Sequence, residues 1–139
     1  MKNIYRILDA NINRAMEGMR VVEEIVRFIL INKKITLELK ELRAELKKIA
    51  SSLPQKELLA ARASLSDVGG ELYTKSESKR GKTEELFYSN IKRAEEAVRV
   101  LEEFSKYVDP KLGRQFKAVR FKLYDLEKQI ARSLRHVRP

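Results

Sequence analysis

A helical sequence signature occurs twice in this chain, at a fixed offset of 79 residues. Residues 9–29 read DANINRAMEGMRVVEEIVRFI, and residues 88–108 read YSNIKRAEEAVRVLEEFSKYV. Aligned without gaps, the blocks are identical at nine positions: Asn11/Asn90, Ile12/Ile91, Arg14/Arg93, Ala15/Ala94, Glu17/Glu96, Arg20/Arg99, Val21/Val100, Glu23/Glu102 and Glu24/Glu103. A repeat of this kind indicates that one structural unit is duplicated, so we expect two similar halves.

Four segments have the apolar periodicity of helices, and they span residues 5–31, 36–53, 83–108 and 112–136. The second and fourth segments also match at an offset of 77, as Lys40/Lys117, Arg43/Arg120 and Leu46/Leu123. The sequence therefore predicts an all-α fold, a four-helix bundle built from two repeated helical hairpins joined by a long functional connector. We expect a single domain, 1–139, divided into repeat one (5–53), connector (54–82) and repeat two (83–136).

The composition limits the classes of protein and partner. Charged residues make up 36% of the chain and the formal net charge is +10, which favours an anionic partner such as a phosphorylated small molecule, a nucleic acid or a membrane surface. No apolar run reaches the roughly 20 residues that span a bilayer, and no secretory leader pattern is visible, so a cytoplasmic protein is expected. The absence of cysteine excludes disulfides and thiolate metal sites.

Polar residues of the repeated block fall on the predicted apolar side of their helices. Asn11 and Arg14 share that sector in the first helix, and Asn90 and Arg93 share it in the third. An arginine facing a core costs several kcal/mol unless a carboxylate or an anion compensates it. We therefore expect a polar cavity in which the arginines hold phosphate oxygens, since the guanidinium fork matches phosphate. The alternative is that each arginine pairs with a carboxylate across the bundle, and the net charge favours the anion site.

Other polar residues lie on the flanks of these helices. The spacing of Glu17, Arg20 and Glu24, repeated at Glu96, Arg99 and Glu103, is typical of exposed ion pairs. Glu23 and Glu102 lie further round and are expected to be solvated. Arg120, Tyr124 and Glu127 flank the apolar stripe of the fourth helix, where they could close the same cavity or form a polar helix edge.

The connector is long for a compact domain. Residues 55–63 are expected to form a short helix, residues 64–70 have turn chemistry, and residues 71–82 are polar without clear period. Long irregular connections are often lids or binding loops, although a plain surface linker remains the alternative. Acids and arginines that could carry a metal and phosphates stand out in it: Arg62, Asp67, Gly69, Glu77 and Arg80.

Four stretches of the chain together resemble a known family: YRILDANINRAMEGMRVVEE, AARASLSDVGGELYTKSESKR, SNIKRAEEAVRVLEEFSK and RFKLYDLEK. The family is the alternative hydroxymethylpyrimidine phosphate kinase, a small helical domain that also occurs fused to thiamine phosphate synthase. Two N-x-x-R-A-x-E-x-x-R-V-x-E-E blocks with a central D-V-G carry the resemblance, which runs from about residue 5 to residue 128.

The resemblance implies ATP-dependent phosphorylation of 4-amino-5-hydroxymethyl-2-methylpyrimidine phosphate to its diphosphate, with Mg²⁺, in thiamine biosynthesis. It gives weight to Arg6, Asp9, Asn11, Arg14, Arg62, Asp67, Gly69, Glu77, Arg80, Asn90, Arg93, Arg120 and Tyr124. On this hypothesis Arg14, Arg93 and Arg120 hold the phosphates, and Asn11 and Asn90 orient the pyrimidine or a phosphate. Asp67 and Glu77 bind the metal, and Arg80 closes over the transferring group. Asp67, Arg80 and Arg93 are the predicted catalytic residues.

Three other interpretations stay open. A helical mutase or lyase could bind a dicarboxylate with the arginine pair, and a basic helical module could bind nucleic acid. The latter is disfavoured because the arginines alternate with glutamates and do not form one basic face. A purely structural bundle would bind nothing. The predicted partners are a phosphorylated pyrimidine and a nucleotide, with no nucleic acid and no membrane, and a homodimer is left open.

Overall fold

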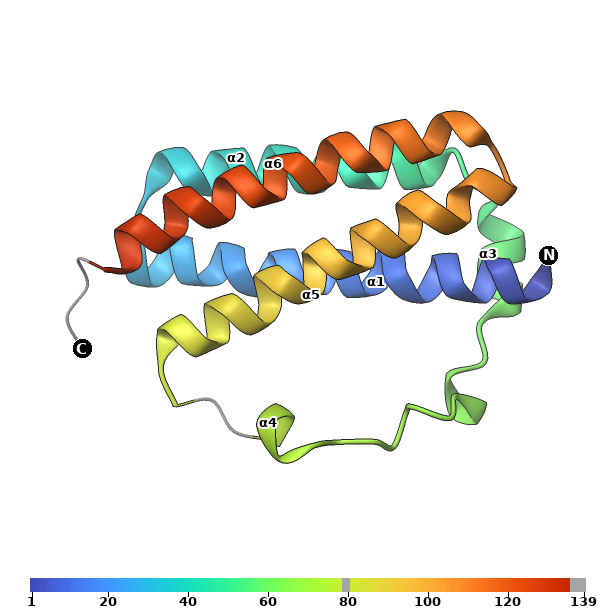
Figure 1. Ribbon diagram of the computed structural model, residues 1–139, viewed down its shortest axis with the longest axis horizontal. Helices are drawn as coiled ribbons and strands as arrows, with labels where there is room; N and C mark the ends of the chain where they lie inside the picture. The colour runs from blue at the N-terminus through green and yellow to red at the C-terminus, as the bar shows by residue number, and fades with distance from the viewer. Residues whose placement is uncertain (79–80, 136–139) are drawn as a thin grey trace.

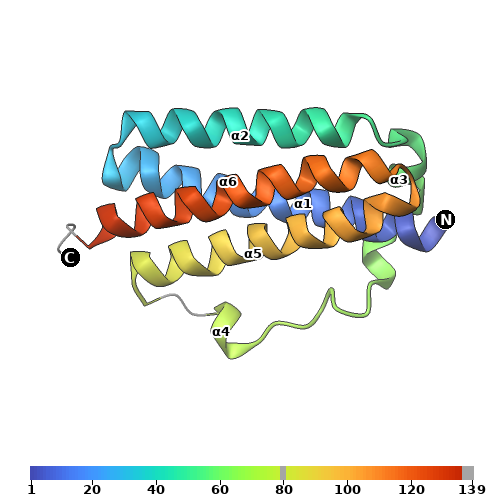
Figure 2. The same cartoon turned by 45° about the horizontal axis from the view of Figure 1, so that its top comes forward.

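The computed structural model describes residues 1–78 and 81–135, and within these ranges all regular secondary structure is helical. Four long helices lie side by side: α1 (Lys2–Glu24), α2 (Lys33–Ser51), α5 (Thr83–Phe104) and α6 (Pro110–Leu134). α1 and α5 form one layer and α2 and α6 the other, as Figures 1 and 2 show. The prediction of an all-α fold is confirmed, and none of the described helices is long and apolar enough to cross a membrane.

Short helical segments complete the path of the chain. α1 continues into a π-helical stretch, η1 (Ile25–Leu30), and α5 ends in a 3-10 turn, η3 (Ser105–Tyr107). The connector contains α3 (Gln55–Ala61), the turn η2 (Ser64–Ser66) and α4 (Lys75–Ser78). α3 packs against α1, and the rest of the connector runs outside the α1–α5 layer (Figure 1).

The helix ends follow from local chemistry. Asn32 caps α2 by accepting a hydrogen bond from the Ile35 amide at 2.9 Å, and Asp109 caps α6 by accepting one from the Lys111 amide at 3.0 Å. Both helices therefore begin a few residues before the predicted starts. Thr83 is the first residue of α5, with Lys82 in the cap position, so this helix begins where the sequence predicts.

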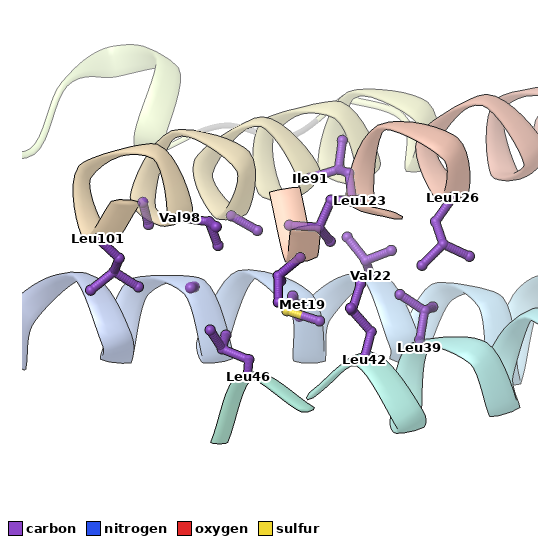
Figure 3. Close-up of a cluster of buried hydrophobic side chains, with 14 of the residues drawn as sticks. Met19, Val22, Leu39, Leu42, Leu46, Ile91, Val98, Leu101, Leu123 and Leu126 are labelled. Atoms are coloured by element: carbon purple, nitrogen blue, oxygen red, sulfur yellow. The ribbon is translucent and has the colours of Figure 1, made fainter. Parts of the chain in front are cut away.

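One hydrophobic core lies between the two layers. Figure 3 shows its centre, to which every long helix contributes: Met19 and Val22; Leu39, Leu42 and Leu46; Ile91, Val98 and Leu101; Leu123 and Leu126. α1 and α5 approach closely at Gly18, where an added Cβ would lie 2.8 Å from the Asn90 carbonyl oxygen. The small residue thus permits the closest approach of the two repeated helices.

In each hairpin, one buried carboxylate links the two long helices. Glu23 of α1 is fully buried and lies 3.0 Å from Arg20 and 3.1 Å from Arg43 of α2. The second hairpin has the same arrangement around Glu102, which is 4% exposed. Its carboxylate lies 2.8 Å from Arg99 and 3.2 Å from Arg120 of α6. We call these clusters the buried ion triads: Arg20–Glu23–Arg43 and Arg99–Glu102–Arg120.

The triads overturn one prediction. Glu23 and Glu102 were expected to be solvated, yet both are buried, because each repeated helix is covered by its hairpin partner as well as by the other repeated helix. The buried face of α1 therefore includes Met19 and Glu23. As a result, Arg14 is exposed on α1, and Arg93 is exposed on α5. The expectation that these two side chains face the core is therefore also wrong. Asn11 is buried as expected.

Candidate functional site

A cavity of about 410 Å³ lies between the first half of α1 and the chain that follows α3. Its polar wall on α1 consists of Asn3, Arg6, Asp9, Asn11, Asn13 and Arg14, and the connector adds Arg62, Ser64 and Asp67. We call it the α1 cavity. The structure thus gathers four of the predicted site residues, namely Asn11, Arg14, Arg62 and Asp67, together with Arg6 and Asp9, to which the resemblance gave weight.

An ion pair with two hydrogen bonds holds the connector against α1. Arg62 donates from Nε and Nη2 to the two carboxylate oxygens of Asp9, each at 2.8 Å, across 53 residues of sequence. The hydrogen bonds and the charge of Asp9 raise the pKa of the Arg62 guanidinium. Because these two charges compensate each other, the Asp9 carboxylate does not cancel the remaining arginines of the wall.

Arg6 and Arg14 are the remaining arginines, and neither forms an ion pair within residues 1–78 and 81–135. Arg14 donates a long hydrogen bond of 3.4 Å to Oδ1 of Asn11. The side-chain Nδ2 of Asn11 in turn donates to the Ile7 carbonyl oxygen at 2.8 Å, one turn earlier in α1. Asn11 therefore orients Arg14, whose guanidinium keeps most of its donors for an anion.

The equivalent residues of α5 do not reach this cavity. Asn90 repeats the local bond of Asn11 by donating to the Leu86 carbonyl oxygen at 2.9 Å. Arg93 is exposed, and no ion pair joins it to a carboxylate of the described chain. The structure therefore presents Arg14 on α1 and Arg93 on α5 as exposed cations, and only Arg14 lines the α1 cavity.

Of the two connector residues predicted to bind a metal ion, Asp67 and Glu77, the structure places one at the α1 cavity. Asp67 lies on the cavity wall, where its Oδ1 accepts a hydrogen bond from the Gly69 amide at 2.8 Å and so closes an Asx-turn. Gly69 therefore acts through its backbone. Glu77 does not line this cavity, and its Oε1 accepts from the amide and the hydroxyl of Thr74 at 3.4 and 3.2 Å. Arg80 lies outside the described residues.

The α1 cavity has one carboxylate, that of Asp67, which is not paired with an arginine of its wall. Among the described residues no group of three or more histidine, cysteine, aspartate or glutamate side chains could hold an ion. Mg²⁺ in phosphoryl-transfer sites is usually bound by one or two carboxylates, by waters and by the substrate phosphates themselves. Asp67 fits that mode of binding as a single carboxylate beside the cavity.

Arg120 and Tyr124 lie away from the α1 cavity. Arg120 is 9% exposed, belongs to the Glu102 triad and donates to the Tyr124 hydroxyl at 3.1 Å. Its guanidinium also lies over the Phe121 and Tyr124 rings, 5.2 and 5.6 Å from their centroids. Tyr124 and Glu127 line a different cavity, so the structure does not bring this trio to the polar cavity of α1.

Comparison with known proteins identifies the family. The model of the ThiD2 family matches residues 6–129, which covers nearly the whole chain. The chain belongs to the ThiD2 family.

Curated relatives share the same region. A thiamine-phosphate synthase of Nostoc punctiforme is 43% identical over 133 residues, which cover 96% of this chain and 37% of that protein. A thiamine-phosphate synthase of Synechocystis sp. is 45% identical over 124 residues, covering 89% of this chain and 35% of that protein. The ThiD2-family chain therefore spans little more than a third of the length of these relatives. No solved structure matches.

A buried acidic group in this ThiD2-family chain has no counterpart in the first repeat. Glu95 is 3% exposed and lies 3.4 Å from Nζ of Lys92, which also lies 3.0 Å from Glu127 of α6. Burial and the neighbouring Glu127 raise the pKa of Glu95 from its ordinary 4.5 to about 8. Glu95 was not among the predicted site residues, although the repeat contains a clue, because the position equivalent to Glu95 is the apolar Met16.

The raised pKa of Glu95 predicts a pH dependence of stability. The folded chain holds this proton up to about pH 8, whereas the unfolded chain releases it near 4.5. The free energy of unfolding should therefore fall as pH rises through this interval. We expect Glu95→Gln to remove that part of the slope in urea denaturation series at pH 5 and pH 8. Glu96→Gln, at the exposed neighbour, should keep it; equal slopes in wild type and Glu95→Gln would show that Glu95 is already ionised at pH 5.

Proposed function

We propose that this chain is an ATP-dependent kinase that converts 4-amino-5-hydroxymethyl-2-methylpyrimidine phosphate to its diphosphate, in the cytoplasm, as a step of thiamine biosynthesis. The observation that carries the proposal is the α1 cavity, where the uncompensated Arg6 and Arg14 lie beside the carboxylate of Asp67. Membership of the ThiD2 family, with relatives named thiamine-phosphate synthase, supports the pathway.

The chemistry requires little beyond charge compensation and positioning. An oxygen of the acceptor phosphate attacks the γ-phosphorus of ATP, a new phosphorus–oxygen bond forms, and the bond to the β–γ bridging oxygen breaks to release ADP. The attacking phosphate monoester is already ionised at neutral pH, so no side chain has to remove a proton. A cavity with arginines and without a general base is therefore sufficient for this reaction.

Arg6 and Arg14 are assigned to the acceptor phosphate. Both line the α1 cavity without a carboxylate partner in the described chain, and Asn11 fixes the direction of Arg14. Arg120 was also predicted to hold phosphate. Because Glu102 already compensates its charge, we assign Arg120 to the support of the hairpin and not to the phosphates.

Asp67 is assigned to the metal. A Mg²⁺ ion bound there together with the phosphates of ATP would supply further compensation of negative charge. The Asx-turn with Gly69 holds the Asp67 carboxylate at the cavity wall. We also assign four further predicted residues to contacts with the nucleotide: Asn90 and Arg93 of α5, and Glu77 and Arg80 of the connector.

The scaffold is proposed to be a four-helix bundle of two duplicated hairpins. The two buried ion triads support this, because each joins the first helix of a hairpin to the second. Glu23 and Glu102 differ by the offset of 79, and Arg43 and Arg120 differ by 77. Both offsets are those of the sequence repeat.

The test is product formation by the purified full chain with ATP and Mg²⁺. ADP release is expected to depend on the pyrimidine phosphate, and ³¹P NMR should show the corresponding diphosphate. A folded sample that forms neither ADP nor diphosphate would refute the kinase proposal. Turnover of a dicarboxylate without ATP would instead support the mutase or lyase interpretation.

A further inference from the structure

A second cavity, of about 440 Å³, lies between the start of α5 and the last turns of α6. Its side chains combine aromatic rings with charges: Tyr88, Tyr124, Glu127, Lys128, Arg132 and Arg135. We call it the α6 cavity. None of these residues lines the α1 cavity, and Tyr124 is the one among them to which the kinase resemblance gave weight.

The α6 cavity shares one equivalent position of the sequence repeat with the α1 cavity. Tyr88 stands 79 residues after Asp9 of the α1 cavity, and each cavity lies beside the first half of a repeated helix. In Figure 1 the start of α1 lies at one end of the molecule, and the start of α5 and the end of α6 lie at the other. At the shared position of the repeat, the aspartate of the α1 cavity is replaced by a tyrosine in the α6 cavity.

Buried neighbours hold both tyrosine rings in place. The Tyr88 ring packs at 4.9 Å, centroid to centroid, on Phe87, which is fully buried. Tyr124 accepts a hydrogen bond from the buried Arg120, whose guanidinium also lies over the ring. Each tyrosine is still about two-fifths exposed. Rings that are ordered before binding and still accessible bind a planar ligand at a low entropic cost.

The charged side of the α6 cavity is positive. Lys128, Arg132 and Arg135 follow one another at intervals of one turn, and none forms an ion pair with a carboxylate of the described residues. The one acid of the wall, Glu127, is already paired with Lys92 at 3.0 Å. Cations at a helix C-terminus also complement the helix dipole, but the dipole does not account for two ordered tyrosines beside them.

We propose that the α6 cavity binds an aromatic ring that carries a phosphate group, of the nucleoside monophosphate class. The ring lies against Tyr88 and Tyr124, because aromatic side chains stack on the faces of bases. The phosphate is bound by Lys128, Arg132 and Arg135.

The ligand of the α6 cavity is a separate ligand and not the reaction partner of the α1 cavity. α1, with its 23 residues, is about 35 Å long at 1.5 Å per residue. The start of α1, beside one cavity, and the last turns of α6, beside the other, lie at opposite ends of the molecule in Figure 1. Groups bound in the two cavities are therefore assigned separate roles. The α6 cavity is thus suited to an effector, and its binding does not depend on the kinase activity.

The test is calorimetric titration of the full chain with AMP, without ATP and without Mg²⁺. We expect one AMP per chain, with adenosine and ribose 5-phosphate each binding at least about tenfold more weakly, because each lacks one of the two recognised groups. Tyr88→Leu and the double variant Lys128→Ala/Arg132→Ala should each weaken AMP binding by about tenfold or more. The matched control is Lys111→Ala/Arg114→Ala, which removes the same charge at the far end of α6 and should bind AMP like wild type.

Three results would overturn the proposal. One is the absence of AMP binding by folded wild-type protein at millimolar concentration. Another is equal weakening in both double variants, or equal binding of ribose 5-phosphate and AMP, since either would indicate a general attraction of anions. The third is loss of AMP binding in Arg14→Ala with retention in Tyr88→Leu, which would place AMP in the α1 cavity.

Discussion

Replacing Glu102 with alanine is expected to lower the free energy of unfolding by about 3–5 kcal/mol, because the buried guanidinium of Arg120 would lose its carboxylate. Arg120 is 9% exposed, and its Nη2 lies 3.2 Å from both oxygens of Glu102, so water cannot readily take the place of the lost partner. Urea denaturation followed by circular dichroism at 222 nm measures the change.

The sequence repeat supplies the matched controls for this prediction. Glu23→Ala should cost a similar amount, since Glu23 contacts the equivalent arginines, Arg20 and Arg43. Glu103→Ala, at the exposed neighbour, should cost less than about 1 kcal/mol. The double variant Glu102→Leu/Arg120→Met, which removes both buried charges, should recover most of the stability. If Glu102→Ala were no more destabilising than Glu103→Ala, the triad would contribute nothing to the hairpin.

The helices could be predicted because their determinants are local. Apolar residues at helical spacing mark the four long helices, Pro54 follows the end of α2, and the expected short helix appears as α3, Gln55–Ala61. The π-helical stretch Ile25–Leu30 and the left-handed backbone of Ile31, with φ of 52°, were not predicted. No residue type in that stretch favours them, so the closure of the first hairpin must impose them.

It was harder to predict which polar side chains are buried. A helical wheel centred on apolar side chains assigns every charged residue either to the solvent face or to an unfavourable place in the core. Glu23 and Glu102 are buried because their charges are compensated from other helices, by Arg43 and Arg120. The match between Arg43 and Arg120 was visible in the sequence, but the contact of each with a glutamate is set by the hairpin geometry.

The candidate site depends on a contact that spacing alone does not reveal. The repeated block indicated Asn11 and Arg14. The cavity also depends on the ion pair of Arg62 with Asp9, two residues that lie 53 positions apart in the sequence. Asn3 and Asn13 on its wall have no distinguishing pattern in the sequence. The tyrosines of the α6 cavity were overlooked as a pair for the same reason, since Tyr88 and Tyr124 come together only when α5 packs against α6.

Arg14→Ala is expected to lower kcat/KM for the pyrimidine phosphate by about 10- to 100-fold, which corresponds to the roughly 1.5–3 kcal/mol of a hydrogen bond to a charged group. Arg14 lines the α1 cavity as an exposed cation without a carboxylate partner in the described chain. Its loss should therefore remove binding energy and leave the fold intact. Initial rates of ADP release at varied concentrations of each substrate measure the effect.

The division between KM and kcat tests the assignment of Arg14 to the acceptor. If Arg14 holds the acceptor phosphate equally in the bound and transition states, KM for the pyrimidine phosphate rises while kcat changes little. Arg93→Ala should instead raise KM for ATP, because the proposal assigns the exposed Arg93 of α5 to the nucleotide. The control Arg114→Ala removes an exposed arginine of α6 and should match wild type in both parameters. Wild-type kcat/KM in Arg14→Ala would mean that the acceptor phosphate binds elsewhere, and a rise in KM for ATP alone would mean that Arg14 binds the nucleotide and not the acceptor.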